Sequence, residues 1–115
     1  MLKVYRLRQG YTIRMSVKKL TTKQVSQAFK KLPNWTVSKA GTKCKATFSH
    51  PTYIDGLVHI ARIAVHAQIE DHHPDITYTY KTLTVTLHTH DVKGLTTKDV
   101  KMAKIINRLL IQDTV

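Results

Sequence analysis

The fold is decided by residues 68–91, which read QIEDHHPDITYTYKTLTVTLHTHD. Pro74 cannot continue a helix and biases His73 towards an extended backbone, so any preceding helix has to end near the paired histidines. Two runs rich in Thr, Tyr and Val follow at 75–80 and 82–90. In the second run large apolar residues alternate with threonines, which is typical of a half-buried strand. The stretch therefore predicts a helix end, a sharp turn and an antiparallel hairpin.

Upstream of this stretch, residues 53–71 are predicted to form the helix that ends at the histidines, with Pro51 and Thr52 at its start. Apolar residues recur along it at helical spacing. At about 100° per residue, Gln68 and His72 continue the apolar face, and His72 is expected still to belong to the helix. We expect that apolar face to gather Ile54, Leu57, Val58, Ala61, Ala64 and Val65.

The remaining segments predict two more helices and a second hairpin. Threonines precede both helices and can cap them, and a turn at Ala40 and Gly41 separates the two strands. The order helix, hairpin, helix, hairpin, helix predicts an α+β fold, in which three helices cover one face of a four-stranded antiparallel sheet. The additional elements are expected at 23–31, 35–39, 43–49 and 97–111.

The charge of the chain is concentrated in its first half. The 115 residues carry a formal net charge of +12, and no Asp or Glu occurs before Asp55. From Asp55 onward the acidic and basic residues balance. We therefore expect residues 1–19 to form a basic N-terminal arm ahead of a single domain at 20–115. An organelle-targeting segment is the alternative interpretation of the arm, since such segments are rich in Arg and poor in acids.

Several classes of protein are disfavoured by composition. Hydrophobic residues make up 42% of the chain, enough for one core, and no apolar run is long enough to cross a bilayer. Cys44 is the single cysteine, so the pattern favours a reducing compartment, with cytoplasmic localisation expected and mitochondrial localisation as the alternative. Nucleic-acid binding is not favoured, because the basic half has few aromatic residues for stacking and no recognisable motif.

The seven histidines carry most of the chemical information. His72 and His73 lie at the expected helix end, and His88 and His90 lie at the end of a strand. Histidine is suited to proton transfer near neutral pH, so two of them can serve as an acid and a base. Zinc would need three or four converging ligands with a different spacing, so no metal site is predicted. The other three, His50, His59 and His66, are interpreted as structural or exposed.

Five spaced elements in this region resemble the signature of the pterin-4a-carbinolamine dehydratases. They are His72-His73-Pro74, an aromatic residue at Tyr80, Thr89-His90-Asp91, Gly94-Leu95-Thr96 and Asp99. Weaker similarity extends over residues 20–110, so only the basic arm lies outside it.

The resemblance implies a lyase, more specifically a hydro-lyase. Members of the family dehydrate 4a-hydroxytetrahydrobiopterin to quinonoid dihydrobiopterin, which serves tetrahydrobiopterin biosynthesis and pterin recycling after aromatic amino-acid hydroxylation. They have the helix and strand order predicted above and require no metal or bound cofactor. They assemble as homotetramers through helix packing, or as dimers. The animal relatives also bind a homeodomain transcription factor as a protein partner and stabilise its dimer.

The resemblance also assigns roles to residues. His72 and His90 would be the catalytic acid and base, in an order that the sequence does not give. His73 would mainly bind the pterin substrate. For Asp99 a favourable charge near a helix N-terminus is an equal alternative to substrate contact. The substrate-binding set implied by the motif is His73, Pro74, Gln68, Asp99 and Thr89.

Two residues depart from the family pattern. Relatives usually carry an acid at the position of Gln68, and a carboxylate there would favour a protonated His72 more than an amide does. Animal relatives carry Trp at the position of Ile76. The isoleucine of this chain lacks the flat surface that a Trp could pack on the pterin. These departures leave a second hypothesis open: a weakly catalytic or non-catalytic protein-binding module that keeps the fold.

Overall fold

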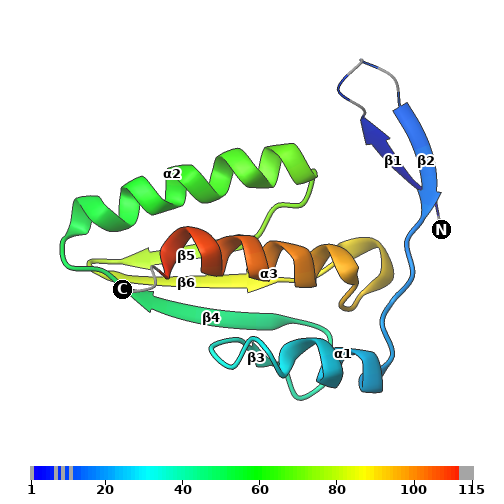
Figure 1. Cartoon of the computed structure of the whole chain (residues 1–115), viewed down its shortest axis with the longest axis horizontal. Coiled ribbons are helices and arrows are strands. Elements are labelled where there is room, and N and C mark those ends of the chain that lie inside the picture. The colour runs from blue at the N-terminus through cyan, green and yellow to red at the C-terminus, as the bar shows by residue number, and fades with distance from the viewer. Residues whose placement is uncertain (1, 7, 9, 11, 112–115) are drawn as a thin grey trace.

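The computed structural model describes residues 2–6, 8, 10 and 12–111. These residues form three α-helices, six β-strands and one short 3₁₀ helix (Figure 1). In chain order the elements are β1 (Leu2–Arg6), β2 (Thr12–Ser16), α1 (Thr22–Phe29), β3 (Thr36–Val37), β4 (Cys44–Ser49), α2 (Tyr53–Glu70), β5 (Asp75–Thr79), β6 (Thr82–Leu87), η1 (His90–Val92) and α3 (Thr97–Leu110).

Strands β3 to β6 form a four-stranded antiparallel sheet in the order β3-β4-β6-β5. In the two central strands Cys44 pairs with Leu87 and Phe48 pairs with Leu83, and all four side chains are buried. Their neighbours along each strand are exposed or half-buried, so one face of the sheet is covered and the other is open. The three helices lie on the covered face. The predicted α+β fold, with its α-β-β-α-β-β-α order, is confirmed.

Each helix begins at a threonine, as predicted. The side chains of Thr21, Thr52 and Thr96 accept hydrogen bonds from backbone amides in the first turns of α1, α2 and α3. The backbone amides of Thr21 and Thr96 in turn donate to the side chain of the third residue of the helix, which completes a capping box. These caps fix where α3 starts, and α3 carries one of the site residues in its first turn.

Helix α2 ends one residue earlier than predicted, at Glu70. Asp71 adopts a left-handed conformation with a φ of 48°, and the amide of His72 donates to the carbonyl of Ala67 over 3.0 Å. This is the hydrogen-bond pattern of a Schellman cap, which closes the helix and turns the chain sharply. The prediction that His72 belongs to the helix is therefore wrong. Its side chain is placed by the turn rather than by the periodicity of α2.

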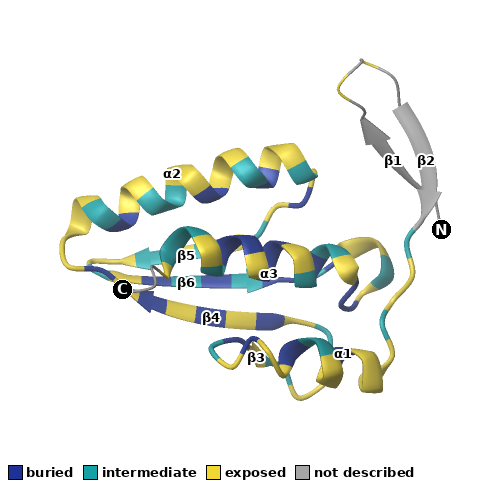
Figure 2. Cartoon of the chain, in the orientation of Figure 1, coloured by how far each residue is buried: buried dark blue, intermediate teal, exposed yellow. Residues whose placement is uncertain are grey.

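The face of α2 that packs on the sheet also differs from the prediction. Gly56, Ile63 and Ala67 are its buried residues, and at Gly56 a β-carbon would overlap the ring of Tyr78. Figure 2 shows that the outer side of the helix is largely exposed. The apolar stripe expected in the core lies on that outer side, with Ile54, Val58 and Val65 between 52% and 62% exposed. The reason is that α2 has two apolar sides, and the narrower one, with a glycine and an alanine, allows closer packing.

The first two strands stand apart from this sheet. β1 and β2 pair antiparallel with each other, from Leu2 opposite Ser16 to Arg6 opposite Thr12, and form a separate two-stranded sheet (Figure 1). The described part of the expected basic arm is thus a hairpin. The alternative interpretation of the arm, as a targeting segment, remains a prediction.

None of the helices among residues 2–6, 8, 10 and 12–111 combines the length and apolar character that spanning a membrane requires.

Candidate active site

A short, buried polar contact joins the turn after α2 to the first turn of α3. The Nε2 atom of His72 lies 2.6 Å from Oδ1 of Asp99, and both side chains are buried. Asp99 has no exposed surface at all. A carboxylate this deep in a protein requires hydrogen-bond partners, because leaving it unpaired would be very costly. His72 is therefore positioned as the N–H donor to a buried acid.

The second oxygen of Asp99 is also fully engaged. Its Oδ2 accepts from the hydroxyl of Thr89 over 2.7 Å and from the backbone amide of Thr96 over 2.9 Å. The hydroxyl of Thr96 lies 2.8 Å from that of Thr89 and can donate to it. Thr89 follows β6 as the N-cap of η1, Thr96 is the N-cap of α3, and Asp99 lies in the first turn of α3. The network ties the His90 loop and α3 to the ring of His72.

This arrangement fixes which nitrogen of His72 is available for chemistry. Nε2 faces Asp99, and Nδ1 has no hydrogen-bond partner among the described residues. Among the described residues, Nδ1 of His50 is the one side-chain nitrogen or oxygen that is both shielded from solvent and without a hydrogen-bond partner. Nδ1 of His72 also lacks a partner but is not shielded in this way, so it retains contact with solvent. The tautomer with its proton on Nε2 leaves a lone pair on Nδ1. Any proton transfer by this ring therefore uses Nδ1.

The second histidine of the pair has a different partner. Nε2 of His73 lies 2.6 Å from Oε1 of Gln68, and both side chains are exposed. The expectation that Gln68 shares a face with His72 is wrong, because the left-handed Asp71 ends the helix between them. An acid at position 68 would act on His73 in this geometry. Pro74 follows directly and is half-buried.

His90 lies in the loop that follows β6. It begins the 3₁₀ helix η1, and its side chain is exposed. A backbone bridge between Thr89 and Gly94 closes the loop, and Lys93 adopts a left-handed φ of 51°. The ring of His90 lies beside that of His88, with 6.0 Å between the ring centroids. His88 itself lies 3.3 Å from the exposed carboxylate of Asp75.

The sequence-predicted site residues thus fall into two hydrogen-bonded groups and two further residues, His90 and Pro74, the latter following His73 directly in the chain. His72, Asp99 and Thr89 form the buried group, and His73 with Gln68 forms the exposed group. His90 is adjacent to Thr89 in the chain but is not hydrogen-bonded to either group. Sequence reasoning missed Thr96 as a member of the network. The capping-box spacing from Thr96 to Asp99 is the signal that could have indicated it.

The chain holds a second histidine pair, which the sequence did not predict. Nε2 of His50 lies 2.8 Å from Nδ1 of His59, which is in the N-terminal half of α2, whereas His72 follows the C-terminal end of that helix. His50 is buried, which is compatible with the structural role expected for it. Burial, followed by the neighbouring His50 and Arg62, lowers the pKa of His59 below its usual 6.5. Across the described residues no group of three or more His, Cys, Asp or Glu is arranged to hold a metal ion.

Comparisons with known proteins identify the family of the chain. The family model for pterin 4 alpha carbinolamine dehydratase matches residues 18–109. A protein of Mycolicibacterium smegmatis, provisionally named a pterin-4-alpha-carbinolamine dehydratase, is 41% identical over 91 residues, which are 79% of this chain and 95% of the relative. A similarly named protein of Rhodospirillum rubrum is 38% identical over 68% of this chain and 81% of its own.

Solved structures give the same result at the level of the fold. A crystal structure from Brucella melitensis, described as a transcriptional coactivator/pterin dehydratase, superposes with a TM-score of 0.78 and 28% identity, over 81% of this chain and 99% of that one. A pterin dehydratase-like protein described as a RuBisCO assembly factor has a TM-score of 0.61 at 15% identity and shows the shared fold alone. With a family match that spans most of its length, the chain belongs to the pterin-4a-carbinolamine dehydratase family.

Proposed function

We propose that this protein is a hydro-lyase that dehydrates 4a-hydroxytetrahydrobiopterin to quinonoid dihydrobiopterin and so serves tetrahydrobiopterin recycling. The observation that carries the proposal is the buried contact of His72 with Asp99, which holds one histidine in a single tautomer at the edge of the fold. Structural histidines seldom require a fully buried carboxylate, whereas histidines that move protons are commonly oriented in this way.

The reaction needs two proton movements. The hydroxyl on the carbinol carbon has to gain a proton to leave as water, and the adjacent ring N–H has to lose one. Two side chains that exchange protons near neutral pH can perform these steps without a metal. General acid–base catalysis of this kind accelerates a reaction roughly 10²–10⁴-fold. His72 and His90 are the proposed pair.

The contact with Asp99 favours the basic role for His72. The carboxylate holds the proton on Nε2, so Nδ1 is the acceptor that can take the proton from the pterin ring nitrogen. The same carboxylate compensates the positive charge that the ring then acquires. His90, exposed at the start of η1, would supply the proton to the departing hydroxyl. The product then forms with the release of one water molecule, and the two histidines return to their starting states by proton exchange with solvent.

The remaining residues divide between binding and positioning. His73, held by Gln68 over 2.6 Å, and the adjacent Pro74 would contact the pterin. Asp99 and Thr89 were expected to bind substrate, but both are fully buried and bonded to each other. We therefore assign them to positioning His72 and the His90 loop. No metal or bound cofactor is part of the proposal.

The exposed apolar side of α2 supports assembly into a homo-oligomer. Leu57, Val58, Val65 and Ile69 are 38% to 61% exposed at helical spacing along one side of the helix. A continuous apolar stripe of this kind on a surface helix is typical of helix–helix interfaces. We infer that a second copy of the chain covers it, in a dimer or tetramer.

A protein-binding module with little catalysis is the second candidate. The Brucella melitensis relative is described as a coactivator as well as a dehydratase, which favours a partner protein for this chain too. The test is the rate at which freshly generated 4a-hydroxytetrahydropterin dehydrates with and without the protein. Acceleration by the protein supports the enzyme, and a rate equal to that in buffer favours the binding module.

A further inference from the structure

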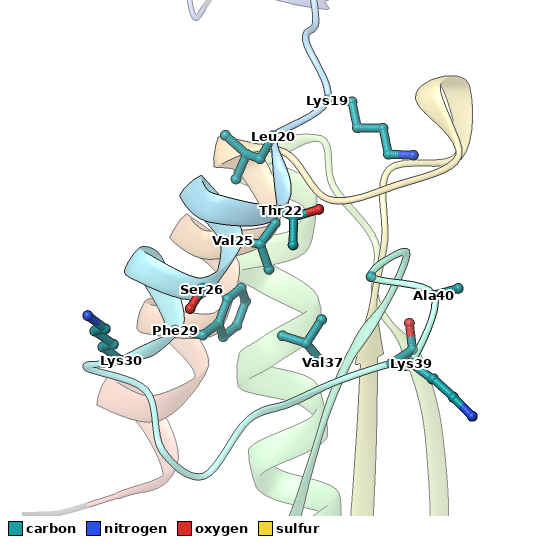
Figure 3. Close-up of a pocket in the computed structure, with 12 residues that line it drawn as sticks. Lys19, Leu20, Thr22, Val25, Ser26, Phe29, Lys30, Val37, Lys39 and Ala40 are labelled. Carbon is teal, nitrogen blue, oxygen red and sulfur yellow. The ribbon is translucent and has the colours of Figure 1, made fainter.

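A cavity of about 510 Å³ lies between α1 and the turn that joins β3 to β4, and the linker before α1 forms part of its wall. Figure 3 shows this cavity with its lining residues. It is within the size range of protein binding pockets, about 300–1,000 Å³. None of its lining residues belongs to the histidine site, so the proposed dehydration does not use it.

The floor of the cavity is apolar. Val25 and Phe29 project from α1, and Val37 projects towards them from β3 (Figure 3). Val25 and Phe29 also belong to the hydrophobic core and are only 7% and 8% exposed. The floor is therefore rigid, because its side chains are held by the packing beneath them. It can receive one apolar side chain of moderate size.

The rim of the cavity is strongly basic. Lys19, Lys30 and Lys39 stand on three sides of the floor, and Figure 3 shows their side chains directed outward from it. Within the described part of the chain none of the three has an ion-pair partner, and the first 54 residues contain no acid that could supply one. Three uncompensated ammonium groups around an apolar floor attract negative charge.

The aliphatic part of one of these lysine side chains packs against a glycine. A β-carbon on Gly94 would lie 2.5 Å from Cε and 2.8 Å from Cδ of Lys19, so the stem rests directly on the glycine. The next residue, Leu20, donates from its backbone amide to the carbonyl of Leu95 over 2.8 Å. The Lys19 side of the cavity is thus attached to the loop that carries His90.

From these features we propose that the cavity is a docking site for a short acidic segment of a partner protein, anchored by one aromatic or large aliphatic side chain. The anchor fills the floor formed by Val25, Phe29 and Val37. Acidic residues on both sides of the anchor pair with the lysines of the rim. The lysine side chains point outward rather than into the floor, which fits an extended segment that crosses the cavity better than a compact anion enclosed within it.

Other occupants fit these features less well. The part of the basic arm that precedes Lys19 carries the same sign of charge as the rim and would be repelled. A nucleic acid would match the lysines but has no single apolar anchor for the floor. The site also does not depend on catalysis, so it can be tested whether or not the protein proves to be a dehydratase.

The test is a fluorescence-anisotropy titration of the full-length protein with a short dye-labelled peptide, in which one phenylalanine is flanked on both sides by glutamates. We expect saturable binding to the wild-type protein. Replacing the phenylalanine of the peptide with serine should weaken binding at least about tenfold, because the anchor carries most of the affinity. Lys30→Glu and Lys39→Glu should each weaken binding about five- to tenfold or more.

Lys23→Glu is the matched control, since Lys23 is exposed on α1 but does not line the cavity. Binding should survive this change with at most about a twofold loss. The surface lysines can be replaced without threatening the core, and unchanged circular dichroism checks the fold. The proposal is overturned if the phenylalanine and serine peptides bind alike, if Lys23→Glu weakens binding as much as Lys30→Glu, or if a duplex oligonucleotide displaces the peptide from wild type and Lys30→Glu equally well.

Discussion

Asp99 in the first turn of α3 accepts a hydrogen bond from His72 over 2.6 Å, although 27 positions separate the two residues in the chain. The contact links the Schellman cap of α2 to the capping box of α3. Both caps are local features, but only the folded sheet brings them together. Asp99 also accepts hydrogen bonds from Thr89 and Thr96. One buried carboxylate therefore fixes the positions of the histidine, the loop after β6 and the start of α3 relative to one another.

Replacing Asp99 with asparagine should lower both stability and activity. One oxygen is exchanged for an NH₂ group, which then faces another donor in a buried site. We expect the free energy of unfolding to fall by about 1–3 kcal/mol, and the dehydration rate to fall by about 10² or more because the Nε2 proton of His72 loses its acceptor. Urea denaturation and the turnover rate measure the two effects.

Asp71→Asn is the matched control for that change. Asp71 is exposed, and its left-handed φ of 48° is tolerated by asparagine. Stability and activity should both be close to wild type. If Asp99→Asn behaves like Asp71→Asn, the buried network has no role in holding His72.

The outer side of α2 should control self-association. Val65 is 59% exposed on this side, and a lysine there would place a charge in the centre of the expected interface. We expect the wild-type protein to sediment as an oligomer and Val65→Lys to shift it towards the monomer. Thr47→Lys adds the same charge on the open face of the sheet and should leave the oligomer intact. A wild-type protein that remains monomeric at micromolar concentration would contradict the assignment.

The His50–His59 pair should make stability depend on pH. Burial, His50 and Arg62 lower the pKa of His59 in the folded state below the usual 6.5, while Asp55 opposes the shift. As pH falls below about 6.5 the unfolded chain takes up this proton before the folded chain does, so the folded state loses stability. The loss ends once pH falls below the lowered folded pKa.

Urea midpoints measured from neutral pH down to about pH 5 would reveal this slope. His59→Gln should reduce it, whereas His66→Gln, which removes an imidazole from the same helix, should not. An unchanged slope in His59→Gln would rule out the pair as its source.

Cys44 should be chemically inert in the native protein. Burial raises the pKa of its thiol from 9.0 to about 12, and the negative charge of Asp99 adds to the effect. This difference corresponds to about a thousandfold less thiolate at a given pH near neutrality. Reaction with a disulfide reagent should therefore be slow in buffer and rapid in denaturant. Rapid reaction of the native protein would show that the strand carrying Cys44 opens easily.

The fold could be predicted largely because its signals are local. Thr21, Thr52 and Thr96 mark the helix starts, and the alternation in β4 and β6 identifies which face is buried. Which side of α2 packs on the sheet could not be predicted, because both of its sides are apolar. Only the sheet decides that Gly56 and Ala67 face inward, since a close approach needs small residues there.

The sequence motif named the candidate site residues but could not show which of them contact one another. The motif indicated His72, His73, His90 and Asp99 as a group, but the partners of His72 and His73 depend on the turn at Asp71. A single left-handed residue there rotates His72 away from Gln68 and towards Asp99. The helical spacing between Gln68 and His72 could not indicate this change of partner. That spacing places two residues on one face only while the helix continues, and α2 ends at Glu70.

The most direct test of the account is the dehydration rate of freshly generated 4a-hydroxytetrahydropterin, compared for wild type, His72→Ala, His90→Ala and His66→Ala. We predict that the wild-type protein accelerates the reaction, and that His72→Ala and His90→Ala each lose roughly 10²-fold or more of that acceleration. His66→Ala, which lies outside the site, should retain it. A wild-type rate equal to that of buffer, or His72→Ala and His90→Ala variants as fast as wild type, would contradict the claim that these histidines form a dehydratase active site.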